Sequence, residues 1–271
     1  MLRAACCLLL VAGLGACAGV QKMSDGALAP PAAAVRELAP SGTLRVAINF
    51  GNPILASKDA ASGEPRGVSV DLARELGRRL GVPVQLVTYT AAGKVVEGIR
   101  NKEWDIGYFA IDPVRAMDTD FTAAYVVIEG AYLVRQDSPI RKNEEVDRAG
   151  NRIVVGKGSA YDLYLTREVK QATLVRAPTS PAVTDMMVAD KIEVAAGVKQ
   201  QLQADAKRIP GLRLLDGRFM VINQAMATPK GRPNGLEYLT KFVEEMKVSG
   251  FVAEALKRHG IEGAAVAPAG K

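Results

Sequence analysis

The sequence predicts an α/β fold built from two α/β units that lie side by side and are joined by two chain crossings. Short apolar strands alternate with amphipathic helices in two successive series, a pattern typical of parallel sheets with helices on both faces. A strand predicted over 131–135 leads from the first series to the second, and the chain returns near 221–228. Two crossings between two units imply a hinge.

The first series starts with a strand predicted over 44–48. The segment 68–80 has apolar residues at the spacing of an amphipathic helix, and Gly81 follows it as a C-terminal stop. The other elements of this series are a strand over 82–87, a helix over 94–101, a strand over 105–111 and a helix that begins at Asp112-Pro113.

The second series repeats the alternation of strands and helices. Its predicted elements are strands over 152–156, 173–177 and 192–196, and helices over 159–169, 181–189 and 198–206. After the extended return over 219–228, the segment 235–259 carries two more amphipathic helices.

The 271-residue chain has a formal net charge of +6. Its Lys and Arg residues are interspersed with Asp and Glu, without a basic stripe, so we expect no nucleic-acid partner and a mild preference for anionic ligands. His259 is the only histidine, and the chain has neither a P-loop nor a complete GxGxxG motif. We therefore expect no histidine-based triad, no metal site and no cofactor.

The first 17 residues have the features of an export signal: a positive start, an apolar run and a small-residue end. The letters LGAC at 14–17 are similar to the lipobox of bacterial lipoproteins, in which Cys17 would be lipidated. Cleavage at the A-x-A pattern of 16–18 is the alternative. Both place the protein in the periplasm, with or without a membrane anchor. Residues 18–41 are expected to form a flexible tether and 261–271 a flexible tail.

Several short motifs in fixed order resemble family 3 of the extracellular solute-binding proteins, the amino-acid-type receptors of ABC importers. The resemblance covers roughly residues 42–260. The matching segments are GTLRVA at 42–47, GVSVDLAREL at 67–76, KEWD at 102–105, DPVR at 112–115, DFTAAY at 120–125, VGKGS at 155–159 and MKVSG at 246–250.

This resemblance implies a type II periplasmic binding protein fold, with lobe 1 formed by 42–134 and 223–260 and lobe 2 by 135–222. It also implies a monomer that closes its lobes on a small solute and presents that solute to an inner-membrane ABC permease. By the same resemblance, Arg115 and the turn at Ser159-Ala160 hold the ligand carboxylate from opposite lobes.

Elementary chemistry supports that assignment. An Asp112-Pro113 helix start would place Arg115 at the positive end of a helix dipole, where a cation is disfavoured unless an anion arrives. A guanidinium donates two parallel hydrogen bonds to one carboxylate. The Ser159 hydroxyl and nearby N–H groups would begin a second helix and face the same anion. The alternatives are a surface ion pair for Arg115 and a plain N-cap for Ser159.

The chain departs from the amino-acid receptors at the position that holds the ligand's α-ammonium. In the family pattern, an acidic residue lies five positions after the acidic residue of the preceding strand. In this chain that strand residue is Glu193, and the residue five positions after it is Val198. The first strand ends in Asn49, where the family usually has an aspartate or a similar polar residue. These departures favour a carboxylate without a free α-ammonium over an α-amino acid.

Further ligand-binding candidates are Asp112, Phe50, Tyr161 and Lys199, which lie at strand ends or helix starts that border the expected crevice. Two other functions remain open. A periplasmic sensor or accessory protein would have the same fold but no permease. A cyclohexadienyl-dehydratase-like enzyme would need an acid or base in the cleft, for which Asp112 is the candidate.

Overall fold

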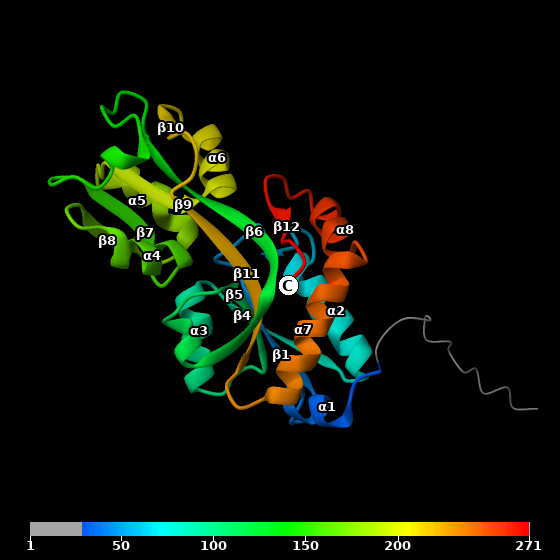
Figure 1. The fold of residues 1–271 in the computed structure, drawn as a ribbon. Coiled ribbons are helices and arrows are strands. Elements are labelled where there is room, and N and C mark those ends of the chain that lie inside the picture. Colours follow the sequence, from blue (N-terminus) through cyan, green and yellow to red (C-terminus); the bar gives the residue numbers. More distant parts are fainter. Residues whose placement is uncertain (1–28, 271) are drawn as a thin grey trace, which may run out of the picture.

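The computed structural model describes residues 29–270 and has two lobes joined by two long strands (Figure 1). The export signal, Cys17 and the first part of the expected tether lie outside the described residues. Within the described part, no helix has both the length and the apolar character needed to cross a bilayer. The α/β class predicted from the sequence is confirmed.

Lobe 1 is built on three parallel strands, and β1 lies between the other two. Its helices begin and end close to the predicted positions, because their apolar periodicity is strong. The elements are β1 (Leu44–Asn49), β4 (Val84–Tyr89), β5 (Ile106–Ala110), α2 (Val68–Leu80), α3 (Ala92–Arg100), α7 (Pro233–Val248) and α8 (Phe251–Arg258), with a small hairpin of β2 (Ser57–Lys58) and β3 (Pro65–Arg66).

Lobe 2 has the same kind of parallel sheet, with β7 between β8 and β9. Its elements are β7 (Arg152–Gly156), α4 (Ala160–Glu168), β8 (Thr173–Ala177), α5 (Val183–Ala189), β9 (Val194–Val198), α6 (Lys199–Arg208) and β10 (Leu212–Leu214). Short 3-10 turns lie at Asn143–Glu145 and Ser180–Ala182.

The crossing strands β6 (Thr119–Arg135) and β11 (Met220–Pro229) make one continuous sheet of the two lobes, in the order β4-β1-β5-β11-β6-β9-β7-β8. β6 pairs with β11 up to Gly130 and with β9 from Gly130 onward. The ladder between β6 and β11 has register shifts on both sides of Ala225. Such irregularities bend and twist a strand pair locally. Figure 1 shows both strands running from one lobe into the other.

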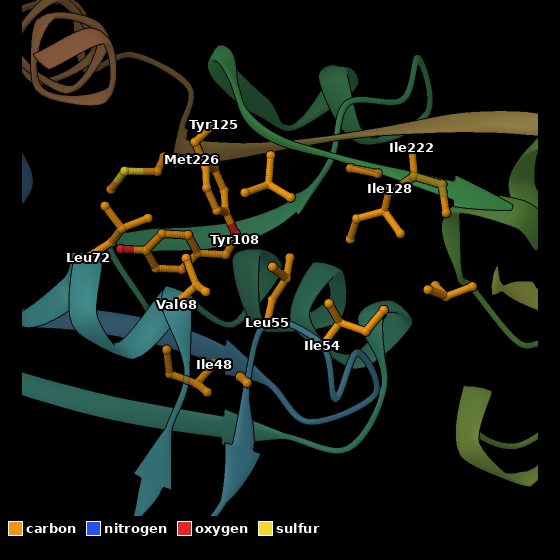
Figure 2. Close-up of a cluster of buried hydrophobic side chains, with 14 of the residues drawn as sticks. Ile48, Ile54, Leu55, Val68, Leu72, Tyr108, Tyr125, Ile128, Ile222 and Met226 are labelled. Atoms are coloured by element: carbon orange, nitrogen blue, oxygen red, sulfur yellow. The ribbon is translucent and has the colours of Figure 1, made fainter. Parts of the chain in front are cut away.

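A single apolar cluster extends from lobe 1 along these crossing strands (Figure 2). Tyr108 and Tyr125 pack edge to face, with ring centroids 5.9 Å apart. Further along, Ile128 of β6 and Ile222 of β11 face each other in register and are also fully or almost fully buried. The hinge strands are therefore packed as core, and we expect the lobes to move by bending this ladder.

Two predicted elements near residue 115 are wrong in extent. The helix expected from Asp112-Pro113 is a single 3-10 turn, Arg115–Met117. The strand expected over 131–135 begins at Thr119 instead, so no room is left for a helix. The Thr119 hydroxyl donates to the Arg115 carbonyl over 2.7 Å and closes the turn. The helix-dipole argument for Arg115 therefore does not apply.

The expected tether contains a helix, α1 (Ala32–Leu38), so that prediction is wrong for this segment. Ala34 and Leu38 are fully buried and four residues apart, on one face of the helix. Leu38 lies against α7 where Gly235 leaves room for it, since a Cβ at 235 would come within 2.7 Å of the leucine side chain. Glu37 accepts a hydrogen bond from the Gly235 N–H over 2.7 Å. The helix could not be predicted from the sequence, because its segment is short and rich in alanine, and two apolar residues four positions apart show too little periodicity.

We expect Leu38→Ala to lower the unfolding free energy by about 2–4 kcal/mol, because it leaves a cavity between α1 and α7. For a chain of this size the melting temperature should fall by roughly 5–10 °C. Thermal denaturation followed by circular dichroism measures this, with Val248→Ala, at a side chain that is 78% exposed, as the matched control. An unchanged melting temperature would mean that α1 does not contribute to the fold.

The expected flexible tail is also ordered in part. Its short strand β12 (Ala265–Val266) pairs with β6 at Val127 and Val126. The Lys247 ammonium donates to the Pro268 carbonyl over 2.9 Å. The residues 264–267 are four consecutive small apolar residues, a run too short and too close to Gly and Pro to be predicted as a strand.

Candidate functional site

A small cavity lies between the two lobes and is the main candidate for a ligand site. Its volume is about 30 Å³, room for about two water molecules, since each needs about 10–15 Å³ of such volume. Both lobes and β11 contribute to the lining. The lining residues are Asn49, Gly51, Asn52, Ala92, Phe109, Ala110, Arg115, Ser159, Ala160, Tyr161, Ser180, Val198, Ile222 and Gln224.

Arg115 provides the one charged side chain of this lining, and it is 98% buried. One Nη donates to the Ala110 carbonyl of lobe 1 over 3.0 Å, and the other donates to the Gly158 carbonyl of lobe 2 over 2.9 Å. The guanidinium also lies over the Phe109 ring, 5.6 Å from its centroid. The buried Nε has no hydrogen-bond partner. The fork therefore keeps donors available for an anion, because Nε–H and a second N–H on each Nη remain.

The burial of Arg115 has an electrostatic cost. Loss of solvation lowers the pKa of Arg115 to about 10, and the Asp112 carboxylate nearby offsets only part of this effect. The guanidinium remains charged at neutral pH, at a cost of about 3 kcal/mol relative to its ordinary pKa. A carboxylate bound at this position would compensate the buried charge and raise the pKa again.

The N-terminus of α4 forms the opposite wall of the cavity. The Ser159 hydroxyl oxygen accepts from the Asp162 N–H over 3.0 Å, as an N-cap does. Its proton remains available for donation, because a hydroxyl accepts and donates at once. The first N–H groups of the helix, at Ala160 and Tyr161, have no intrahelical acceptor. This wall and Arg115 together suit a carboxylate held from both lobes.

The two lobes approach each other closely beside Arg115. Gly158 has a φ of +71°, and a Cβ there would come within 2.8 Å of the Gly93 Cα in α3. The lobes are also joined by an ion pair between Asp112 of lobe 1 and Arg167 of α4, 3.0 Å apart. Asp112 also accepts from the Val114 N–H over 2.8 Å. Asp112 is thus occupied in joining the lobes and lies outside the cavity lining.

We expect Arg167→Gln to weaken ligand binding by about threefold, because opening the lobes breaks its ion pair with Asp112. The effect is small since the arginine is 39% exposed and partly exposed pairs contribute little. Isothermal titration calorimetry measures it. Arg148→Gln is the control, because Arg148 pairs with Glu145 inside lobe 2. Equal affinities for the two variants would exclude a role for the pair in closure.

The loop after β1 brings two asparagines to the cavity. The Asn49 side-chain oxygen accepts from the Gly51 N–H over 2.8 Å, so its amide NH₂ is the group left to donate. Gly51 is required for this turn, because a Cβ there would come within 2.9 Å of the Thr90 carbonyl. The Asn52 side-chain oxygen is buried and has no hydrogen-bond partner.

Val198 lies in the cavity lining at the end of β9, 9% exposed. It is the N-cap residue of α6 but provides no side-chain cap. Ile222 and Phe109 add apolar surface beside it. No carboxylate belongs to the lining formed by the described residues. The cavity therefore combines one cation with neutral donors and acceptors.

Of the residues expected at the site, Arg115, Ser159, Ala160, Asn49 and Tyr161 line the cavity. Phe50, Lys199 and Asp112 do not. Phe50 packs on the core of lobe 1, with the Lys58 ammonium 5.6 Å from its ring, and Lys199 pairs with Glu129 of β6 over 2.8 Å. Contact of any of these residues with a ligand stays a prediction.

Sequence reasoning missed Phe109, Ile222 and Gln224 as lining residues. Gln224 gave a usable signal, since it is a polar residue in the middle of a buried strand, 6% exposed. Phe109 gave none, because its strand is buried along its whole length and no alternation marks the face toward the cavity.

The fold is similar to that of solved binding proteins. A mutant of ArgBP from T. maritima has a TM-score of 0.72 at 23% identity, over 84% of this chain and 100% of its own. The solute receptor for L-cysteine of Neisseria gonorrhoeae has the same TM-score and identity, over 83% of this chain and 92% of its own. AncCDT-1, described as an ancestral amino acid-binding protein and precursor of cyclohexadienyl dehydratase, has a TM-score of 0.70 at 21% identity, over 83% of this chain and 98% of its own.

No curated protein sequence is significantly similar to the chain. The family model of the bacterial extracellular solute-binding proteins, family 3, matches residues 44–262. This match covers both lobes and the two crossing strands. The resemblance inferred from the short motifs is confirmed, and the chain belongs to family 3 of the bacterial extracellular solute-binding proteins.

Proposed function

We propose that this protein is a periplasmic receptor that closes on a small carboxylate without a free α-ammonium and delivers it to an ABC permease. Members of the family bind small solutes and work with such permeases. The observation that carries the proposal is the cavity lining, in which Arg115 is the one charge among the described residues. A buried, unpaired cation favours an anionic ligand.

The same lining argues against an α-amino acid. The similar structures include proteins described as complexed with lysine or bound to L-arginine, and a receptor for L-cysteine. An α-ammonium in the present cavity would meet Val198 and neutral amides, with no carboxylate to compensate it. Burying a charge without such a partner costs several kcal/mol. We therefore expect the part of the ligand that occupies the cavity to carry one negative charge and no positive charge.

A binding role is favoured over a dehydratase. Such an enzyme needs an acid or a base that reaches the ligand. The titratable side chains of the lining are Arg115 and Tyr161, and burial raises the pKa of Tyr161 to about 12. Asp112, the candidate for that role, is paired with Arg167. Both lining groups therefore stay protonated at neutral pH and suit binding better than proton transfer.

Titration calorimetry with two panels tests the proposal: the standard amino acids, and keto, hydroxy and aromatic acids without an amine. We expect binding within the second panel only. Tight binding of a standard amino acid and none of the organic acids would overturn it.

The permease partner is tested by uptake of the labelled ligand in cells with and without this gene. Lipidation of Cys17 is tested by incorporation of labelled fatty acid, with Cys17→Ser as control.

A further inference from the structure

We propose that the C-terminal segment 260–268 is a third connection between the lobes, which restrains their opening. The crossing strands β6 and β11 join the lobes covalently, whereas this segment joins them by contacts alone. In Figure 1 it is the red segment beside β6, between the helices of lobe 1 and α6 of lobe 2. The inference goes beyond the proposed function and does not depend on which solute is bound.

The segment is fixed to lobe 1 at three points. Its strand β12 pairs antiparallel with residues 126–127 of β6. Just after β12, the Ala267 N–H donates to the Tyr125 carbonyl over 3.1 Å. The Lys247 ammonium of α7 donates to the Pro268 carbonyl over 2.9 Å, and the lysine side chain is only 3% exposed. Because these bonds involve both β6 and α7, the segment moves with lobe 1.

The same segment touches lobe 2 at Gly263. This glycine lies against the side chain of Gln200, in the first turn of α6. A Cβ built on Gly263 would come within 2.6 Å of the Gln200 Nε2 and within 3.4 Å of its Cγ and Cδ. Gln200 comes two residues after Val198, which ends β9 and lines the cavity. The contact therefore joins the tail of lobe 1 to the element that follows the cavity wall in lobe 2.

The segment also shortens the free part of the hinge strand. β11 occupies one edge of β6 from Thr119 to Gly130. On the other edge, β12 pairs with residues 126–127 and β9 of lobe 2 pairs from Gly130 onward. Within the described sheet, only Ile128 and Glu129 lie between these two ladders. Since bending a paired stretch distorts its hydrogen bonds, β12 limits the stretch of this edge that bends freely to two residues.

The contact at Gly263 opposes movement away from the closed arrangement. In that arrangement Arg115 donates to carbonyls of both lobes, and Asp112 pairs with Arg167. If opening carried α6 away from the segment, the packing of Gln200 on the glycine would be lost. If opening carried α6 toward the segment, atoms already in contact would overlap. Either movement has a cost, so the segment favours closed lobes.

Removal of residues 263–271 tests the inference, because it leaves α8 and both crossing strands in place. Distances between the lobes are measured by pulsed electron paramagnetic resonance on protein refolded from denaturant, which removes bound solute. Spin labels are attached at Arg100→Cys in lobe 1 and Arg148→Cys in lobe 2, whose native side chains are 76% and 64% exposed. The three native cysteines are replaced by serine.

We expect the wild-type chain to give mainly the distance of the closed arrangement. In the truncated chain the ratio of open to closed molecules should be about tenfold higher, the effect of one or two lost contacts. The melting temperature verifies that the truncated chain is folded.

A second variant isolates the contact with lobe 2. Gln200→Ala keeps the segment in place and removes the side chain that packs on Gly263, so the same ratio should rise about threefold. Gln171→Ala is the matched control, since Gln171 is an exposed glutamine of lobe 2 between α4 and β8. It should give the wild-type distances.

The inference is overturned if the folded truncated chain keeps the wild-type distances, or if the wild-type chain is mainly open. It is also overturned if Gln200→Ala and Gln171→Ala shift the distances equally, because the contact with Gly263 is then not the cause. Should the truncated chain fail to fold, the two glutamine variants decide alone. No solute enters these measurements, so each of these failures leaves the proposed function untouched.

Discussion

Replacement of Arg115 by methionine is expected to weaken carboxylate binding by at least 100-fold. A carboxylate held by a buried guanidinium gains charge-assisted hydrogen bonds of about 1.5–3 kcal/mol each, and two of them amount to two or more powers of ten in affinity. Titration calorimetry measures the loss. Arg100→Met is the matched control, because Arg100 is 76% exposed and is not among the residues that line the cavity.

The same substitution should leave the ligand-free protein about as stable as before. Methionine removes two hydrogen bonds to carbonyl groups, but it also removes the cost of a buried charge that lowers the pKa of Arg115 to about 10. A melting temperature of the variant more than a few degrees below that of the wild type would show that Arg115 is mainly structural.

In the wild-type protein, binding should weaken as the pH rises above about 10, because the guanidinium then loses its proton before an anion arrives.

Val198→Asp is expected to create binding of α-amino acids such as alanine, with an affinity about 10- to 100-fold above that of Val198→Asn. The aspartate would place a negative charge in the lining, where the present ligand cavity has none among the described residues. An ammonium paired with it gains a charge-assisted hydrogen bond of about 1.5–3 kcal/mol, against about 0.5–1.5 kcal/mol for a neutral partner. Binding of organic acids should weaken at the same time, through repulsion between like charges.

The fold should tolerate this change, because Val198 is the N-cap of α6 and provides no cap itself. Aspartate and asparagine are both good N-cap residues. The asparagine variant is therefore matched in shape and capping and differs in charge alone. Calorimetry of alanine and lactate on both variants makes the comparison. Equal affinities of the two variants for alanine would mean that this position does not face the ligand.

The order of elements could be predicted from the sequence because each helix and buried strand has its own period. The helix at 68–80 and the strands at 152–156 and 173–177 begin and end where they were expected. Prediction failed where local pattern is weak and tertiary contacts decide. α1 is held by Leu38 against α7, and β12 exists only because β6 offers it an edge.

At the site, the residues with special chemistry were predictable and their surroundings were not. Arg115 and Ser159 belong to short motifs and lie in the cavity. The partner of Asp112 is Arg167, 55 residues further along the chain, and only the meeting of the two lobes reveals it. Asn52 follows Asn49 in the same loop, but the absence of a partner for its oxygen is a property of the packed structure.

Strand β11 connects the lobes and also presents Ile222 and Gln224 to the cavity, next to the register shifts at Ala225. A substitution on this strand that alters ligand preference will also alter the bending stiffness of the hinge. Selectivity and closure energy are therefore encoded in shared positions. During divergence of such a receptor, a new ligand and a new open-to-closed balance would have to be acquired together, or through the loops alone.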